Sequence, residues 1–143
     1  MNVAAILRSK GSQVVTVSPE QSIADVARVL AEARIGAVVV SSDHMRVKGI
    51  LSERDIVVAL ATRGAAVLDM KASELMTSKV TTCSLDDEAA GLMAVMTDRR
   101  IRHVPVLHKN ELCGMISIGD VVKWRVGEIE QEADALRAYV AQA

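Results

Sequence analysis

The residues best suited to chemistry are two serine–aspartate pairs of the same form. Ser52 and Asp55 are separated by two residues, and so are Ser117 and Asp120. Each pair opens an apolar helical segment, where a Ser-x-x-Asp pattern can close a capping box. A helix start also offers unpaired N–H groups to a phosphate, and a nearby carboxylate can accept the hydroxyls of a ribose. A capping role and a ligand-binding role are compatible, because one aspartate can cap the helix and also bind a ribose.

The elements that must position these pairs occur twice in the chain. Ser18 and Ser84 each begin a predicted helix, with an amide or an acid three residues later. Behind them, apolar residues recur at i, i+3, i+4 and i+7, which is typical of one buried helix face. They are Ile23, Val26, Ala27 and Leu30 in the first helix and, 66 residues later, Ala89, Leu92, Met93 and Met96 in the second.

Short apolar runs predict strands on either side of these helices. Residues 14–17 and 80–83 precede the helices, and residues 35–40 and 101–107 follow them. A turn glycine, Gly49 or Gly114, then enters one more strand, which leads into the Ser-x-x-Asp pair and a second helix. The unit is therefore strand, helix, strand, strand, helix, and its two copies predict an α/β (α+β) fold.

Basic side chains distinguish the second repeat from the first. Arg102 and His103 begin the strand that contains Pro105, whereas Gly36 and Ala37 stand 66 residues earlier. Cations that enter a buried strand are costly unless an anion meets them, and a guanidinium matches phosphate geometry well. We therefore predict that Arg102 and His103 contact a phosphate. The two arginines just before them, at positions 99 and 100, fit a solvated strand end.

This order of elements, with each repeat ending in Gly-hydrophobic-hydrophobic-Ser-x-x-Asp, resembles the CBS (cystathionine β-synthase) domain. Two such repeats in tandem resemble the CBS pair, or Bateman module. The resemblance divides the chain into domains at 8–67 and 73–130 and a helical tail at 131–143. It implies two β-α-β-β-α repeats packed about a pseudo-two-fold axis. It also implies a non-catalytic sensor that binds AMP, or else ADP, ATP or NAD, between the repeats and signals occupancy to a partner protein.

The same resemblance implies which residues hold the nucleotide. Asp55 and Asp120 would bind the ribose, and Ser52 and Ser117 would lie close to the sugar and phosphate. In the family, the segment before the first strand of one repeat approaches the aspartate of the other. That maps Lys10, Ser12, Gln13 and Val14 next to Asp120, and Ser78, Lys79 and Val80 next to Asp55. The phosphates would meet the basic residues before the hydrophobic-Pro-hydrophobic strand, namely Arg102 and His103 before Pro105.

The two implied sites differ in the residues inside each Ser-x-x-Asp pair. Ile118 and Gly119 are neutral and leave the backbone open to a ligand, and Ile118 could sandwich an adenine ring together with Val14. At the other site Glu53 could repel a phosphate while Arg54 could attract one. We therefore predict that the site at Asp120 binds more tightly.

Composition excludes several classes of function. The formal net charge is -1 and the only aromatic residues besides the histidines are Trp124 and Tyr139, so neither phosphate-driven nor stacking recognition of nucleic acid is expected. Neither the two cysteines nor the three histidines have metal-ligand spacing, and no nucleophile–base pair or P-loop is present. Catalysis and a catalytic cofactor are therefore not expected. The apolar run at residues 3–7 is too short for a signal peptide, and no membrane span is present, so a cytoplasmic location is expected.

The second helix of each repeat predicts self-association. Residues 56–60 are apolar on nearly every side of a helix, and residues 121–122 continue the pattern more weakly. One pair of repeats cannot cover both helices, so a homodimer is expected. The tail carries an apolar stripe that could pack on a partner chain or on its own domain: Ile129, Ala133, Leu136 and Val140. A purely structural dimerisation module without a ligand site is the alternative function.

Overall fold

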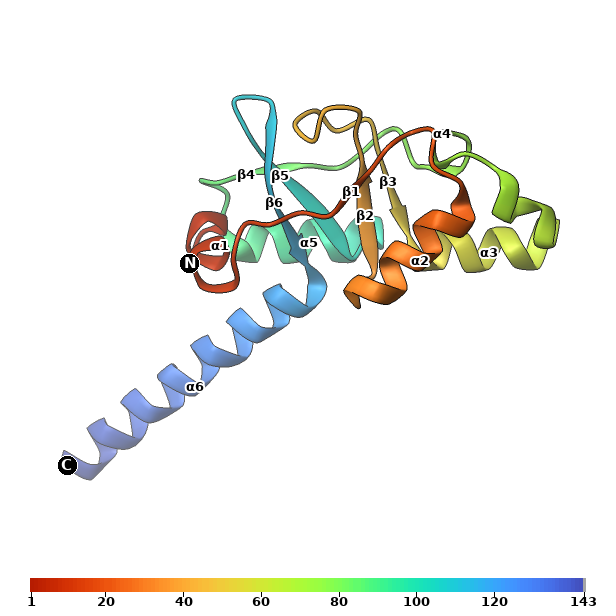
Figure 1. Ribbon diagram of the computed structural model, residues 1–143. Helices are drawn as coiled ribbons and strands as arrows, with labels where there is room; N and C mark the ends of the chain where they lie inside the picture. Colours follow the sequence, from red (N-terminus) through yellow and green to blue (C-terminus); the bar gives the residue numbers. More distant parts are fainter. Residues whose placement is uncertain (143) are drawn as a thin grey trace.

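The duplicated pattern folds as two copies of one small unit, each a three-stranded sheet with its helices (Figure 1). The computed structural model describes residues 1–142. The first copy comprises β1 (Thr16–Val17), α2 (Ile23–Ala33), β2 (Ala37–Val40), β3 (Gly49–Ser52) and α3 (Glu53–Arg63). The second comprises β4 (Cys83–Ser84), α5 (Ala89–Arg99), β5 (His103–His108), β6 (Glu111–Ser117) and α6 (Ile118–Gln142). The predicted α/β fold with two strand–helix–strand–strand–helix repeats is confirmed.

The two sheets share one topology. Their strands lie in chain order, with the first two parallel and the last two antiparallel. Every residue of β2 is buried, which accounts for its unbroken apolar run, because a strand covered on both faces has no polar side. The strands β1 and β4 are only two residues long, so the predicted runs at 14–17 and 80–83 pair with their neighbours only at their ends.

The first helix of each repeat begins later than the sequence predicted. Ser22, not Ser18, caps α2, and its Oγ accepts a hydrogen bond of 3.1 Å from the N–H of Asp25. The hydroxyl of Ser18 instead accepts from Glu20 N–H at 3.1 Å, which closes a turn before the helix. The prediction of a cap at Ser18 is therefore wrong, because a turn uses that hydroxyl first.

The same correction applies to the second repeat. Glu88 occupies the N-cap of α5 and makes no side-chain cap, while the N–H of Ser84 donates to Asp87 Oδ2 at 2.9 Å. The predicted buried faces of both helices are nevertheless confirmed. Their buried residues are Ile23, Val26 and Leu30 in α2 and Ala89, Leu92 and Met96 in α5.

Two short segments that precede the repeats pack on the opposite repeat. The helix α1 (Val3–Lys10) buries Val3, Ile6 and Leu7 in the core of the second repeat. The 3-10 helix η1 (Ala65–Asp69) and the helix α4 (Ala72–Leu75) lead towards β4 but pack on the core of the first repeat. The predicted start of the first domain, residue 8, lies inside α1. The two repeats are therefore linked by reciprocal contacts as well as by the chain.

The glycines at the repeated Gly-hydrophobic-hydrophobic motif are explained by these contacts. A Cβ atom on Gly114 would lie 2.6 Å from Cδ1 and 2.8 Å from Cδ2 of Leu7. A Cβ atom on Gly49 would overlap the side chain of Met76, which follows α4. Neither glycine has a positive φ angle. The sequence predicted turn glycines, but the structure requires them because a side chain from the opposite segment lies against the strand.

Substitution of Gly114 tests this close approach. We expect Gly114→Ala to lower the free energy of unfolding by about 1–3 kcal/mol, the usual cost of overpacking a well-packed site. Chemical denaturation monitored by circular dichroism measures the change. Gly91→Ala in α5 is the matched control, because no atom lies within 4 Å of the added Cβ. The control should stabilise by about 0.5–1 kcal/mol. Equal effects of the two substitutions would contradict the contact with Leu7.

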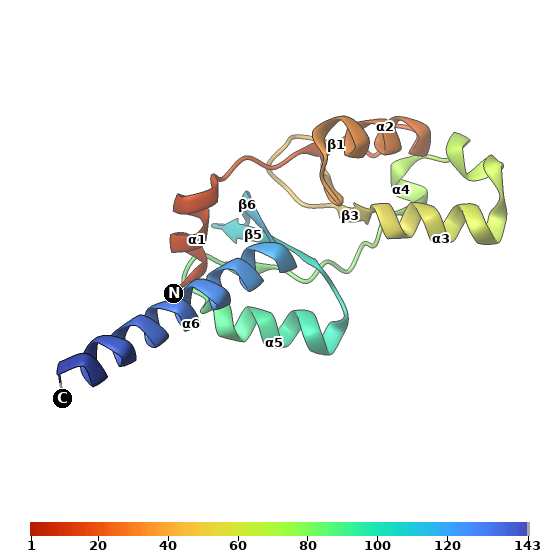
Figure 2. The same cartoon turned by 90° about the horizontal axis from the view of Figure 1, so that it is seen from below.

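The long helix α6 leaves the second repeat soon after it begins. Val121 is its buried residue, and Trp124 packs on the edge of the second core. Beyond that point the helix projects away from both repeats, as Figures 1 and 2 show. The tail therefore does not pack on its own domain, which was one of the two arrangements that the sequence allowed.

Candidate functional site

Both Ser-x-x-Asp pairs form the capping boxes that the sequence allows. At α3 the Ser52 Oγ accepts from Asp55 N–H at 3.2 Å, and the Ser52 N–H donates to Asp55 Oδ2 at 2.9 Å. At α6 the equivalent distances between Ser117 and Asp120 are 3.2 Å and 2.8 Å. The capping role therefore fixes each aspartate at a helix start. It does not exclude a ligand, because a carboxylate has further lone pairs.

A cavity of about 460 Å³ lies beside Asp55, within the usual range of about 300–1,000 Å³ for small-molecule sites. Its wall has three parts. The first repeat contributes the start of β2, the end of β3 and the start of α3. The second part is the extended segment after α4, and the third is the end of α5 together with the start of β5. The wall includes seven residues that the sequence assigned to nucleotide binding: Ser52, Arg54, Asp55, Lys79, Val80, Arg102 and His103.

The charge of this cavity favours an anion. Its wall contains four cationic side chains and only two carboxylates. Within residues 1–142 none of the four cations forms an ion pair. Clefts with an excess of one charge attract ligands of the opposite charge. The cations are Arg54, Lys79, Arg100 and Arg102, and the carboxylates are Glu53 and Asp55.

His103 adds a neutral imidazole to this wall at ordinary pH. Burial is the largest influence and lowers the pKa of His103, while the charge of nearby Glu53 opposes the shift. The ring also lies against Gly36, where an added Cβ would be 3.1 Å from its Cε1 atom. His103 and Gly36 line a second, smaller cavity as well, so they stand where the two cavities adjoin.

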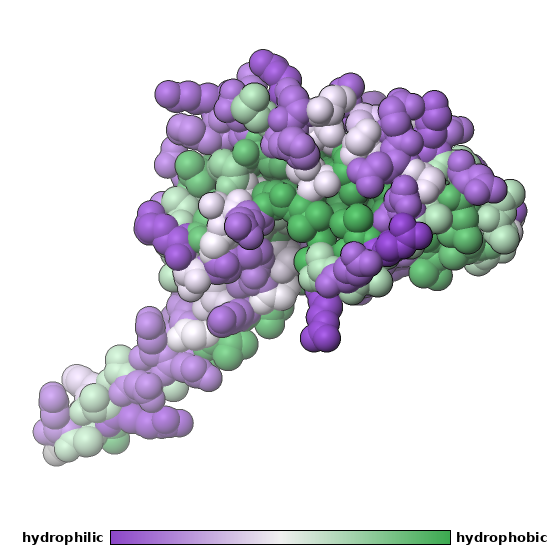
Figure 3. Space-filling view, in the orientation of Figure 1, coloured by the Kyte–Doolittle hydropathy of each residue, from purple (hydrophilic) through white to green (hydrophobic). Residues whose placement is uncertain are grey.

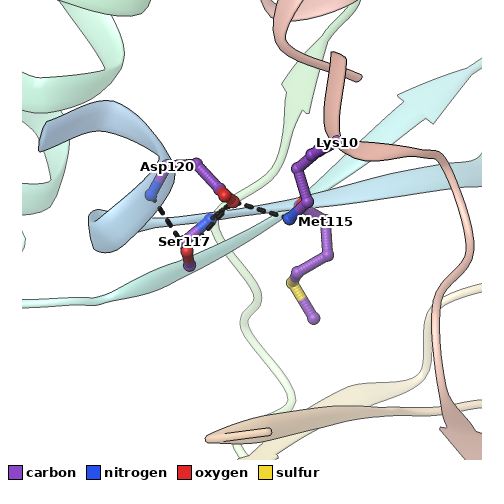
Figure 4. A network of polar contacts seen from close by, with 4 residues as sticks. All are labelled: Lys10, Met115, Ser117 and Asp120. Carbon is purple, nitrogen blue, oxygen red and sulfur yellow. Dashed lines mark hydrogen bonds and ion pairs between the residues drawn. The ribbon is translucent and has the colours of Figure 1, made fainter. Parts of the chain in front are cut away.

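The second cavity, of about 300 Å³, lies near Asp120 and has a different character. Lys10 lines it and directs its ammonium group at the carboxylate, as Figure 4 shows. The Lys10 Nζ is 2.6 Å from Asp120 Oδ2 and 2.8 Å from the carbonyl oxygen of Met115. Asp120 itself is not part of the cavity wall. The wall also includes the predicted residues Gln13, Val14 and Ser117.

The contacts of Asp120 determine its ionisation. Burial is the largest single influence and by itself would raise the pKa of Asp120. Hydrogen bonds from Lys10 and from the backbone and hydroxyl of Ser117, together with the charge of Lys10, outweigh it. The pKa of Asp120 therefore lies below its ordinary value, and the carboxylate is ionised at neutral pH.

Six residues assigned to the site from sequence line neither cavity: Ser12, Ser78, Pro105, Ile118, Gly119 and Asp120. Ser78 borders a separate open hollow. Pro105 is buried within β5, and Ile118 packs against the core of the second repeat. Two arginines that were not assigned to the site from sequence, Arg34 and Arg100, line the smaller and the larger cavity. Both end the first helix of a repeat with a positive φ angle, and their separation of 66 residues was the available signal.

Two copies of one strand–helix–strand–strand–helix unit, with a cavity near the start of the second helix of each, define a tandem-repeat module. A family model described as the CBS domain matches the chain twice, at residues 3–62 and 72–127. The chain belongs to the CBS-domain family. No helix within residues 1–142 is long and apolar enough to cross a membrane.

Known proteins resemble the chain along most of its length. The crystal structure of the CBS-domain containing protein ATU1752 from Agrobacterium tumefaciens is 46% identical and has a TM-score of 0.84, covering 87% of this chain and 99% of that one. The mitochondrial CBS domain-containing protein CBSX3 of Arabidopsis thaliana is 30% identical over 96% of this chain and 71% of its own length. The CBS domain pair of protein MJ0100, solved with 5-methylthioadenosine and S-adenosyl-L-methionine, has a TM-score of 0.79 at 24% identity, with coverage of 90% and 98%.

The ionisation of Asp120 can be tested through stability. A carboxyl group whose pKa is lower in the folded state stabilises the protein above its unfolded pKa of about 3.8, and this contribution is lost as the pH falls through the folded value. We expect Asp120→Asn to reduce the free energy of unfolding by about 1–3 kcal/mol at neutral pH. The difference from the unsubstituted protein should shrink as the pH falls below about 4, which urea denaturation at a series of pH values measures. A difference that does not change with pH would contradict the assignment.

Proposed function

We propose that this protein is a non-catalytic regulatory module that binds an adenine nucleotide in the cavity beside Asp55. The observation that carries the proposal is the combination, around one cavity, of a carboxylate at a helix start with four cations that form no ion pair within residues 1–142. On this proposal, occupancy of the cavity is signalled to a partner protein. The CBS repeats span residues 3–62 and 72–127, and regulation of another protein is the role we propose for them.

The groups of the cavity match the parts of a nucleotide. Asp55 uses Oδ2 for the cap at Ser52, and within residues 1–142 its other carboxylate oxygen makes no hydrogen bond. That oxygen is available to ribose hydroxyls. The arginines and Lys79 suit phosphate groups, and the aliphatic side chains of Ile50, Val80 and Ile101 can cover an adenine ring. AMP is the first candidate, and ADP, ATP and NAD carry the same adenosine and phosphate groups.

Two further points support an adenosine phosphate. The MJ0100 pair was solved with two ligands that contain adenosine, which makes the adenosine group a reasonable choice for a protein of the same fold. S-adenosyl-L-methionine carries a positive sulfonium group, whereas this cavity has an excess of two positive charges. Repulsion therefore favours a phosphate-bearing ligand over that compound.

The contacts lead us to reverse the predicted order of the two sites. Sequence analysis placed the tighter site at Asp120, on the ground that Ile118 and Gly119 are neutral. Lys10 forms an ion pair with one oxygen of the Asp120 carboxylate, however, while Arg100 and Arg102 of the second repeat line the cavity beside Asp55. We therefore propose that Asp55 marks the main site.

Calorimetric titration with AMP, ADP, ATP, NAD and S-adenosyl-L-methionine tests the function. We expect an adenosine phosphate to bind, and Asp55→Asn to weaken it at least tenfold because a charged hydrogen-bond acceptor is lost. Asp120→Asn is the matched control, because it removes the same carboxylate from the other repeat and should leave affinity nearly unchanged. No binding of any of the five would favour the alternative, a structural dimerisation module. Loss of binding only in Asp120→Asn would restore the original order of the sites.

We also propose that the module forms a homodimer through the second helices of its repeats. On α3, Val57 and Val58 are 62% and 51% exposed, and on α6, Val122 and Val126 are 49% and 48% exposed. Figure 3 shows hydrophobic surface over α3, and in Figure 2 both helices lie on the face turned to the viewer. Beside α3 an apolar groove of about 480 Å³ could receive side chains of a partner. Apolar surface of this kind on a small protein favours association.

The dimer can be tested by sedimentation velocity. The unsubstituted protein should sediment as twice the chain mass of 15.3 kDa, and Val58→Glu should sediment as a monomer, because a buried charge opposes association. Leu136→Glu places the same charge on the distal part of α6 and should remain dimeric. Dissociation by Leu136→Glu alone would assign the contact to the tail.

A cytoplasmic site of action is consistent with this role. Adenine nucleotides are abundant in that compartment, and both cysteines, Cys83 and Cys113, are free thiols, as expected in reducing surroundings. Burial is the main cause that raises the pKa of Cys83, to about 12, so this thiol is unreactive in the fold.

A further inference from the structure

We propose that Lys10 closes the site at Asp120 to nucleosides, so that each chain binds a single nucleotide in the cavity beside Asp55. This inference rests on the proposed function and adds a residue that decides how many sites a tandem repeat offers. It predicts unequal sites in a fold whose two sheets share one topology.

The carboxylate of Asp120 is engaged within the protein through one of its two oxygens. Its Oδ2 atom accepts hydrogen bonds from Ser117 N–H at 2.8 Å, from Ser117 Oγ at 2.9 Å and from Lys10 Nζ at 2.6 Å. The side chains of Lys10 and Asp120 are 34% and 20% exposed, so water screens their attraction only partly. A ribose would have to displace a short charge-assisted bond to reach this oxygen.

Lys10 also stands between the carboxylate and the space where a ligand would lie. The smaller cavity is lined by Lys10 but not by Asp120, whereas Asp55 lines the larger cavity directly. The smaller cavity measures about 300 Å³, against about 460 Å³ for the larger one. The ammonium group is thus paired with the carboxylate, and Lys10 rather than Asp120 faces this cavity.

The pseudo-symmetric lysine provides a comparison within the same molecule. Leu7 and Met76 make equivalent contacts with Gly114 and Gly49 and are 69 residues apart, and the same step leads from Lys10 to Lys79. Lys79 lines the larger cavity, yet it forms no ion pair with Asp55 in the part of the chain that the structure describes. The two lysines therefore occupy related positions, but only Lys10 forms an ion pair with the aspartate near it within residues 1–142.

The difference arises from the elements that carry the lysines. Lys10 is the last residue of α1, an eight-residue helix whose Ile6 and Leu7 are buried in the second core. This packing holds the lysine stem in place, and a second contact with the Met115 carbonyl oxygen fixes the ammonium group. The related helix α4 has only four residues and ends at Leu75, so Lys79 lies in an extended segment beyond it. A lysine on that segment has no helix to hold it at Asp55.

Binding stoichiometry tests the closure. Equilibrium dialysis with radiolabelled AMP and, separately, ATP should give one nucleotide per chain for the unsubstituted protein. Lys10→Met keeps the length and apolar stem of the side chain but removes the ammonium group, and it should give two nucleotides per chain. The second site should disappear again in the double variant Lys10→Met, Asp120→Asn. Lys48→Met is the control, because Lys48 is exposed and lines neither cavity, and it should leave the count at one nucleotide per chain.

The outcomes separate this inference from the proposed function. Two nucleotides on the unsubstituted protein would overturn the closure while leaving the site at Asp55 intact. The same conclusion would follow if the unsubstituted protein and Lys10→Met each bound one nucleotide. No nucleotide on the unsubstituted protein but one on Lys10→Met would refute the proposed main site and support the closure. Absence of binding to every variant would overturn both. Lys10→Gln provides a second variant if Lys10→Met fails to show cooperative unfolding, and the same counts are expected for it.

Discussion

The structure depends on the reciprocal packing of α1 and α4 against strands of the opposite repeats. Leu7 lies against Gly114 and Met76 lies against Gly49, at distances that leave no room for a Cβ atom. Main-chain bonds reinforce both contacts, from Val3 N–H to the Asp87 carbonyl and from Ala72 N–H to that of Gln21, at 2.9 Å and 2.7 Å. Because each repeat is completed by a segment that precedes the other, the clefts between them have fixed walls.

This packing also decides where the symmetry is broken. It brings Lys10 and Lys79 to equivalent edges, but only Lys10 continues a helix that is long enough to hold it on an aspartate. Arg102 and His103 stand where the first repeat has Gly36 and Ala37, so cations from the second repeat enter the cavity of the first. Lys10 thereby neutralises the carboxylate near the smaller cavity, whereas the cavity beside Asp55 retains an excess of positive charge.

The repeat unit, the buried helix faces and both capping boxes could be predicted because they follow from short-range periodicity. The helix starts at Ser18 and Ser84 were misplaced, since the same pattern of serine and acid also closes a turn. Seven residues of the cavity beside Asp55 were assigned to the site from sequence, through the resemblance to a family and, for Arg102 and His103, through the cost of placing cations in a buried strand. The resemblance placed Lys10 next to Asp120, but the ion pair between them was not predicted, because it depends on how a helix at the start of the chain docks on a strand more than a hundred residues later. Side-chain periodicity carries no information on such a contact.

The position of the main site within the fold links binding to assembly on the proposed function. Asp55 lies in the first turn of α3, and Val57 and Val58, in the next positions of the same helix, form part of the proposed dimer face. A nucleotide held by Asp55 and by arginines of the second repeat would connect the two repeats at the start of this helix. Any change in the angle between the repeats would then move α3 as a rigid element, and with it the surface offered to the second chain. Coupling through this helix needs no separate pathway. The ligand contact at Asp55 and the proposed dimer contacts at Val57 and Val58 lie within two turns of the same helix.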